Sequence, residues 1–126
     1  MGRGTFEKVL SFPSWPFDKK VYVLSSTIKQ VPVELINKVS ILSSKPSEVL
    51  NYLSQKGYSS LYIDGGKVIQ EFLKEGLIDE LIISKAPILI GSGIPLFGHL
   101  ETDIHFKHIR TIVAGNGLVR SFYEKK

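Results

Sequence analysis

The chain has 126 residues, of which 43% are hydrophobic and 22% are charged, and its net charge at pH 7 is +4. These values are typical of one folded domain over residues 1–126 and exclude a fibrous or disordered protein. No apolar run approaches the roughly 20 residues that span a bilayer, the lysines form no basic stripe, and there is no cysteine. We therefore expect a soluble cytoplasmic protein that binds neither membranes nor nucleic acid.

Helices and strands alternate in the first part of the chain. Apolar residues at spacings of three and four predict helices over residues 3–10, 45–56 and 67–75. Runs of β-branched and aromatic residues predict strands over residues 20–24, 39–42 and 59–64. Ser44 or Ser47 is the expected N-cap of the second helix, and Gly57 and Gly76 are the expected ends of the second and third helices.

Beyond residue 76 the pattern changes to strands without helices. Three runs of strand character, joined by glycine-bearing turns, cover residues 79–90, 103–115 and 117–126. We expect Gly91-Ser92-Gly93 to form a turn and not a phosphate loop, because no amphipathic helix follows it. The sequence therefore predicts an α/β fold whose sheet is parallel in its first part and antiparallel at its edge.

The junction Asp64-Gly65-Gly66-Lys67 is a candidate nucleotide site. In an open α/β sheet, ligands bind where a strand ends, and the next helix offers unpaired amides there. Two glycines would let a diphosphate approach the backbone, and Lys67 would add positive charge. The alternative is that both glycines only shape a tight turn. Burying the Asp64 carboxylate would cost free energy unless it accepts a hydrogen bond, either from a substrate group or from a helix amide.

Two further junctions have side chains suited to phosphate or ribose. Leu24-Ser25-Ser26 ends a predicted strand with hydroxyls, and Gly2-Arg3-Gly4-Thr5 starts a helix with an arginine that can bind phosphate bidentately. Each also has a purely structural explanation, since serines and glycines often form turns. The three histidines are too irregularly spaced for a helical metal pair, so we predict no metal site and no nucleophile–base set.

Together, MGRGTFEKVL, VYVLSS, the stretch LYIDGGKVIQEFLKEGLIDELIISKAPILIGSGIPLF and the closing strands resemble the dihydrofolate-reductase-like reductases. The resemblance is greatest to the reductase domain of bacterial bifunctional riboflavin-biosynthesis deaminase-reductases and its stand-alone relatives. It implies a three-layer α/β sandwich with a mixed, mostly parallel sheet and an antiparallel C-terminal hairpin. It also implies an NADPH-dependent reductase of 5-amino-6-(5-phosphoribosylamino)uracil, or of a related pyrimidine or pterin-like small molecule, that forms a homodimer.

The resemblance also implies roles for individual residues. The residues expected near the cofactor phosphates at the start of the first helix are Gly2, Arg3 and Thr5. Those expected at the adenosine and its 2′-phosphate are Leu24, Ser25 and Ser26. Those expected along the diphosphate and nicotinamide are Gly65, Gly66, Lys67, Val68 and Ile69. Asp64 is the expected substrate contact, and no catalytic residue is expected because such reductases work by positioning the nicotinamide.

The beginning of the chain departs from the family pattern. The family's first strand, its S-x-DG active-site loop and most of its second strand have no counterpart before Met1, so we expect a domain shortened at its N-terminus. The missing strands would lie in the middle of the family's sheet, and one of them would separate the strand around Leu61 from the strand around Ile82. Either the remaining strands close up in a non-standard order, or another chain fills the gap. The alternative function is a catalytically inactive nucleotide-binding or structural relative.

Overall fold

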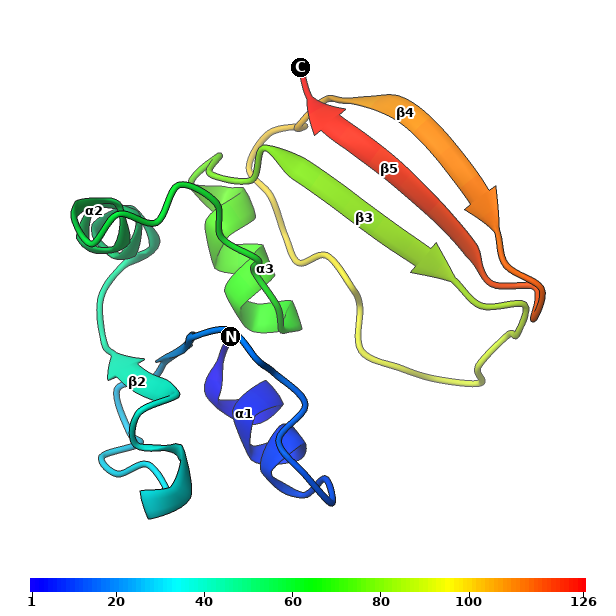
Figure 1. Cartoon of the computed structure of the whole chain (residues 1–126). Coiled ribbons are helices and arrows are strands. Elements are labelled where there is room, and N and C mark those ends of the chain that lie inside the picture. Colours follow the sequence, from blue (N-terminus) through cyan, green and yellow to red (C-terminus); the bar gives the residue numbers. More distant parts are fainter. The chain divides into compact units, whose positions relative to one another are not determined.

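The structure is a computed structural model that describes residues 1–126 and divides into a first unit, residues 1–75, and a second unit, residues 76–126 (Figure 1). The elements of the first unit are α1 (Arg3–Leu10), β1 (Val21–Leu24), the 3₁₀ helix η1 (Val33–Leu35), β2 (Val39–Leu42), α2 (Pro46–Gln55) and α3 (Gly66–Lys74). The elements of the second unit are β3 (Glu80–Lys85), β4 (Phe106–Val113) and β5 (Val119–Lys125). All three predicted helices are confirmed to within one residue at each end.

The sheet of the first unit is parallel, as predicted. Strand β1 pairs with β2 in the register Val21↔Val39 to Leu24↔Leu42. The beginning of the chain extends this sheet on the other side of β1. There the Leu24 amide donates to the Met1 carbonyl at 2.8 Å, and the Met1 amino group donates to the Tyr22 carbonyl at 2.9 Å. This pairing fixes the start of α1 beside the end of β1.

A small apolar core holds α1 against this sheet. Alternate residues of β1 point into it, so that Val21 and Val23 are buried, whereas Tyr22 and Leu24 are half-buried on the other face. The buried members of the core cluster are Phe6, Val21, Val23, Leu35 and Val39. Complete burial of such a side chain stabilises the fold by about 1.5–3 kcal/mol. The core therefore anchors the two strands whose ends carry the serines.

The ends of α2 and α3 show which local predictions hold. Gly57 and Gly76 follow these helices with φ of 94° and 68°, a left-handed conformation that favours glycine, so both predicted ends are confirmed. The predicted caps of α2 are wrong. Its N-cap is Lys45, whose side chain has no hydrogen-bond acceptor, so no side chain caps the helix, and Pro46 occupies the first helical position, which suits proline.

The strand predicted over residues 59–64 is wrong. This segment has no regular structure, and none of its backbone groups takes part in a backbone hydrogen bond. Its composition favours a strand, but β-structure needs a neighbouring strand to complete the ladder, and none pairs with it. Leu61 and Ile63 are half-buried, whereas Tyr62 is 84% exposed. The segment that leads into Asp64 is therefore unpaired.

The second unit is an antiparallel sheet in the order β3-β5-β4, which confirms the predicted antiparallel ending. A β-bulge interrupts the pairing of β4 with β5 between His108 and Arg110. Residues 86–105 contain neither helix nor strand, so the apolar run after Lys85 is not the strand its composition predicts, and no helix follows Gly91–Gly93. Each ladder lies within one unit, β1-β2 in the first and β3-β5-β4 in the second. None of the helices is long and apolar enough to cross a membrane.

Candidate functional site

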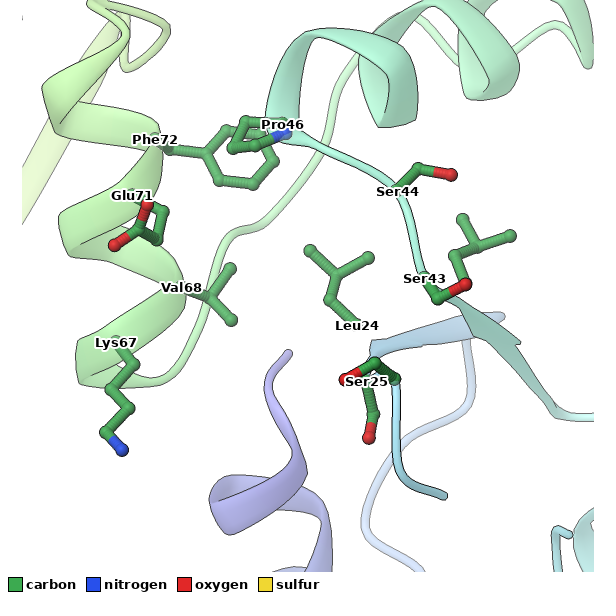
Figure 2. Close-up of a pocket in the computed structure, with 11 residues that line it drawn as sticks. Leu24, Ser25, Ser43, Ser44, Pro46, Lys67, Val68, Glu71 and Phe72 are labelled. Carbon is green, nitrogen blue, oxygen red and sulfur yellow. The ribbon is translucent and has the colours of Figure 1, made fainter. Parts of the chain in front are cut away.

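A cavity of about 320 Å³ lies in the first unit at the ends of β1 and β2 (Figure 2). This volume is at the lower end of the range for small-molecule sites. The residues that line it come from three segments, and they are Leu24, Ser25, Ser26, Leu42, Ser43, Ser44, Pro46, Lys67, Val68, Glu71 and Phe72. Two of the three predicted junctions, the one after β1 and the one at the start of α3, therefore line the same cavity. The third segment, residues 42–46, was not predicted to belong to a site.

The parallel register explains why serines gather at this cavity. Leu24 pairs with Leu42, and the Ser25 amide donates to the Leu42 carbonyl at 2.9 Å. Both strands end in Leu-Ser-Ser, so the serines that follow β1 and β2 come together at one edge of the sheet. Sequence reasoning missed Ser43 and Ser44. The repeated Leu-Ser-Ser after two strand-like runs was the signal that could have found them.

The serines have different hydrogen-bonding roles. The Ser25 hydroxyl accepts hydrogen bonds from the amides of Thr27 at 3.2 Å and Ile28 at 3.1 Å, so it shapes the turn after β1. The hydroxyls of Ser26, Ser43 and Ser44 have no partner within the chain. They are the serine hydroxyls at the cavity that remain available to a ligand.

The two adjacent glycines at the start of α3 differ sharply in their surroundings. Gly65 has φ of 97°, and a Cβ added to it would lie 2.6 Å from Thr5 Oγ1. Its amide donates to Asp64 Oδ1 at 2.8 Å. Around Gly66 there is no atom within 4 Å of the added Cβ. Gly65 is therefore required by the turn, whereas Gly66 leaves open space in front of the backbone.

The first turn of α3 presents unpaired amides. Its first helical hydrogen bond runs from the Ile69 amide to the Gly65 carbonyl at 2.9 Å. The amides of Gly66, Lys67 and Val68 therefore have no acceptor within the protein. With the positive end of the helix dipole, they form a position that favours an anion.

The first turn of α1 lies beside that of α3. A Cβ on Gly2 would lie 2.9 Å from Val68 Cγ2, and Gly65 contacts Thr5 as described above. The first hydrogen bond of α1 runs from the Phe6 amide to the Gly2 carbonyl at 3.0 Å, so the amides of Gly4 and Thr5 have no acceptor within the helix. Two helix N-termini thus converge, and glycines at both allow the close approach.

Charged side chains surround this corner. The Arg3 guanidinium donates to Thr27 Oγ1 at 3.4 Å and lies 3.9 Å from the Glu7 carboxylate. Lys67 is at the rim of the cavity and has no ion-pair partner, and its side chain extends away from the serines (Figure 2). Glu71, on the same side of α3, pairs with Lys74 at 3.2 Å. Of the Arg3 and Lys67 side chains, Lys67 is therefore the one without an ion-pair partner that would compete with an anionic ligand.

Two groups beside the corner have shifted pKa values. Burial lowers the pKa of the Met1 amino group, and the nearby Asp64 carboxylate opposes this shift. Burial raises the pKa of Tyr22 to about 12, and the hydrogen bond with Tyr58 adds to the shift. Tyr22 is therefore neutral at physiological pH. Asp64 is half-buried and accepts one hydrogen bond, from the Gly65 amide at the start of α3.

The predicted site residues fall into two groups. Those that meet where α1 and α3 begin are Gly2, Thr5, Asp64, Gly65, Gly66 and Val68. Those at the cavity are Leu24, Ser25, Ser26, Lys67 and Val68. Arg3 is linked to the loop after β1 through Thr27, and Ile69 contributes the first helical bond of α3. No group of three His, Cys, Asp or Glu side chains is arranged to hold a metal.

Comparison with known proteins gives consistent matches. The family model described as the RibD C-terminal domain matches residues 12–120. The uncharacterized protein YwjB of Bacillus subtilis (strain 168) is 36% identical over 113 residues, which are 85% of this chain and 63% of YwjB. The uncharacterized protein YyaP of the same organism is 29% identical over 106 residues, which are 83% of this chain and 54% of YyaP. The chain thus spans less than two thirds of both curated relatives.

Two solved structures resemble the chain. A protein from Shewanella sp. PV-4, provisionally named a riboflavin biosynthesis protein, has a TM-score of 0.95 and 46% identity over 100% of this chain and 72% of its own. A pyrimidine reductase-like protein from Corynebacterium diphtheriae has a TM-score of 0.62 and 20% identity over 83% of this chain and 50% of its own. The second likeness concerns the fold alone. Together they confirm the predicted dihydrofolate-reductase-like fold class.

Proposed function

Because the chain belongs to the RibD C-terminal domain family, we propose that it is an NADPH-dependent reductase of the riboflavin-biosynthesis type. The proposed substrate is 5-amino-6-(5-phosphoribosylamino)uracil or a related pyrimidine or pterin-like small molecule. The provisional name of the Shewanella protein, at 46% identity, supports the pathway. The proposed compartment is the cytoplasm, with which a chain without cysteine is compatible.

The observation that carries this proposal is the corner where α1 and α3 begin. The open side of Gly66 and the free amides of Gly66, Lys67 and Val68 suit a diphosphate, which needs close contact with backbone donors. The cavity beside it, with free hydroxyls at Ser26, Ser43 and Ser44, suits the adenosine end of the cofactor. The residues present therefore fit NADPH.

The protein's own part in the reaction is to bind and orient. When bound, NADPH supplies the hydride that reduces the substrate. The amides at the start of α3 would hold the diphosphate, and Lys67 would neutralise part of its charge. Asp64 would accept a hydrogen bond from an amine or amide of the substrate with the carboxylate capacity that Gly65 leaves unused. Positioning of this kind needs no nucleophile.

The activity can be tested directly with the purified chain. Absorbance of the reduced nicotinamide would be followed after addition of 5-amino-6-(5-phosphoribosylamino)uracil, with dihydrofolate as the competing substrate. We expect NADPH oxidation that depends on the pyrimidine. NADPH binding without oxidation of the cofactor by either substrate would contradict reductase activity.

Asp64→Asn is expected to separate substrate binding from cofactor binding. The amide keeps the size of the side chain but removes the charge, so KM for the pyrimidine should rise about tenfold, as for a lost charge-assisted hydrogen bond. NADPH affinity should stay within about twofold or improve, because the carboxylate donates no hydrogen bond to an anion and its loss removes a negative charge beside the proposed diphosphate position. The two constants would be measured by steady-state kinetics and by NADPH titration. Equal loss of both would contradict the role of Asp64.

A second candidate function is a nucleotide-binding relative without catalytic activity. The unpaired segment over residues 59–64 favours it, because Asp64 follows a stretch that no strand supports. Precise placement of a substrate contact needs a rigid scaffold. This candidate predicts saturable NADPH binding with no turnover, so the same two measurements distinguish it from the reductase.

We also propose that the chain forms a homodimer through one face of the β3-β5-β4 sheet. One row across this face holds Glu80, Glu124 and Lys107, and the next holds Ile82, Phe122 and Arg110. Arg110 stacks over the Phe122 ring at 4.1 Å, and none of these charged groups has an ion pair within the chain. A cavity of about 300 Å³ opens on this face beside the half-exposed Ile82.

Charge complementarity favours a second copy as the partner of this face. Glu80 and Glu124 lie directly opposite each other in the ladder, and like charges there destabilise a sheet. A two-fold axis along β5 would place β3 of one copy over β4 of the other. Because the rows are preserved by that rotation, Glu80 of each copy would meet Lys107 of the other, and the two Glu124 side chains would meet at the axis, flanked by the two Lys107 side chains.

Lys107→Glu is therefore expected to shift the protein from dimer to monomer in sedimentation velocity, with dimer affinity lowered at least about tenfold. Adding Glu80→Lys should restore the dimer by exchanging the two charges. Lys85→Glu is the matched control, since Lys85 pairs with Val119 in a row whose side chains point to the other face. A monomeric wild type, or equal effects of Lys107→Glu and Lys85→Glu, would contradict this interface.

A further inference from the structure

We propose that a surface at the C-terminal end of α2 binds an acidic segment of a partner protein. This tyrosine–lysine surface consists of three tyrosines and two lysines, which are Lys20, Tyr22, Tyr52, Lys56 and Tyr58. None of these residues lines the cavity at the ends of β1 and β2, so the inference does not depend on the proposed function.

The three tyrosine rings form one packed group on the face of β1 opposite Val21 and Val23. The Tyr22 ring lies edge-to-face with the Tyr52 ring at a centroid distance of 6.5 Å and with the Tyr58 ring at 5.9 Å. This arrangement is one that aromatic pairs prefer, so each ring restrains the orientation of its neighbour. Tyr22 is half-buried, whereas Tyr52 and Tyr58 are 42% and 41% exposed. The two outer rings are therefore held in place but remain open to a partner.

The end of α2 fixes the backbone position of Tyr58. The Gly57 amide donates to the Ser54 carbonyl at 3.0 Å, and Gly57 has the left-handed φ of 94°. The Tyr58 amide donates to the Leu53 carbonyl at 3.1 Å. These two bonds form a Schellman motif, which gives the chain a defined path where it leaves the helix. Tyr58 therefore follows a fixed helix end and is not part of a free loop.

Two ammonium groups lie over these rings without a counter-ion. Lys20 Nζ is 5.7 Å from the centroid of the Tyr22 ring. Lys56 Nζ is 5.2 Å from the centroid of the Tyr52 ring, which lies one helical turn earlier in α2. Neither lysine forms an ion pair within the chain. Because a ring face attracts a cation without neutralising it, both charges are oriented and remain uncompensated.

The charges and the rings together favour an acidic polypeptide as the partner. Its carboxylates would pair with the two ammonium groups, and an apolar side chain beside them would pack on the exposed rings of Tyr52 and Tyr58. Tyrosine is enriched in protein interfaces and among the residues that contribute most of their binding energy. A nucleic acid suits this surface less well, because bases stack on free ring faces, whereas ammonium groups lie over Tyr22 and Tyr52.

The test is the fluorescence anisotropy of a labelled, glutamate-rich peptide that carries one phenylalanine, titrated with the full chain. We expect saturable binding that weakens as the salt concentration rises. Lys56→Gln should weaken binding about threefold, the effect of losing one exposed ion pair. Tyr52→Ala should weaken it at least about fivefold, because it removes both a ring and the contact that orients Lys56. Lys8→Gln is the charge-matched control, since Lys8 is exposed on α1 and lies over no ring.

The absence of saturable peptide binding by the wild type at low salt would overturn the inference. Equal effects of Lys56→Gln and Lys8→Gln would also overturn it, because net charge alone would then explain the attraction. Unchanged binding by Tyr52→Ala would show that the rings take no part. Tighter binding of a thymidine oligonucleotide than of the peptide would assign the surface to nucleic acid instead. Unchanged thermal unfolding of each variant would separate these effects from misfolding.

Discussion

Gly65→Ala is expected to destabilise the first unit by about 1–3 kcal/mol, the usual range for a side chain forced into a sparsely populated backbone conformation. Gly65 has φ of 97°, and the new Cβ would lie 2.6 Å from Thr5 Oγ1. Both the backbone strain and the steric clash oppose folding. Urea unfolding followed by circular dichroism would measure the change in the free energy of unfolding.

Gly66→Ala is the matched control for this experiment. The two glycines are adjacent, but Gly66 has open space around its added Cβ and is the first residue of α3. Alanine there should leave stability unchanged or raise it by up to about 1 kcal/mol. Adding Thr5→Ala to Gly65→Ala should recover part of the loss by removing the clash. Equal stability of the Gly65 and Gly66 variants would contradict the assigned packing.

Gly66→Leu is expected to weaken NADPH binding at least about tenfold while the protein remains folded. The side chain would fill the open space in front of the free amides of Gly66, Lys67 and Val68, which is where the diphosphate is proposed to lie. Loss of hydrogen bonds to a charged ligand accounts for the size of the effect. Titration with NADPH would measure the loss of affinity, and the melting temperature recorded in parallel would show that the variant is folded.

Gly115→Leu provides the control for bulk. Gly115 lies near the turn between β4 and β5 and also has no atom within 4 Å of an added Cβ. The same change at this position should leave NADPH affinity as in the wild type. If Gly66→Leu binds NADPH as well as Gly115→Leu does, the diphosphate does not approach the start of α3.

The parts of the fold that are local could be predicted from the sequence. Helix α3 was found because Val68, Phe72 and Leu73 recur at helical spacing and Gly76 ends it, all within one short window. The strand expected at residues 59–64 was wrong because a strand depends on a neighbour that hydrogen-bonds to it, and composition carries no information about that neighbour.

The candidate site, too, could be predicted only where it depends on residues that are close together in the sequence. The glycines at the start of α3 stood out in the sequence, but which of them the turn requires depends on Thr5, a residue of another helix. Ser43 was not predicted as a site residue, because its position beside Ser25 depends on the parallel register of β1 and β2. Features of the site that depend on contacts between distant segments of the chain therefore could not be predicted from the sequence.

Titration of the wild-type chain with NADPH tests the central claim most directly, namely that the free amides at the start of α3 bind an anionic nucleotide. Trp15, the single tryptophan, gives an intrinsic fluorescence signal within the first unit, and calorimetry gives an independent readout. We expect saturable binding that weakens as the salt concentration rises, because the contacts are largely electrostatic. The absence of saturable binding by both methods at low salt would contradict the claim.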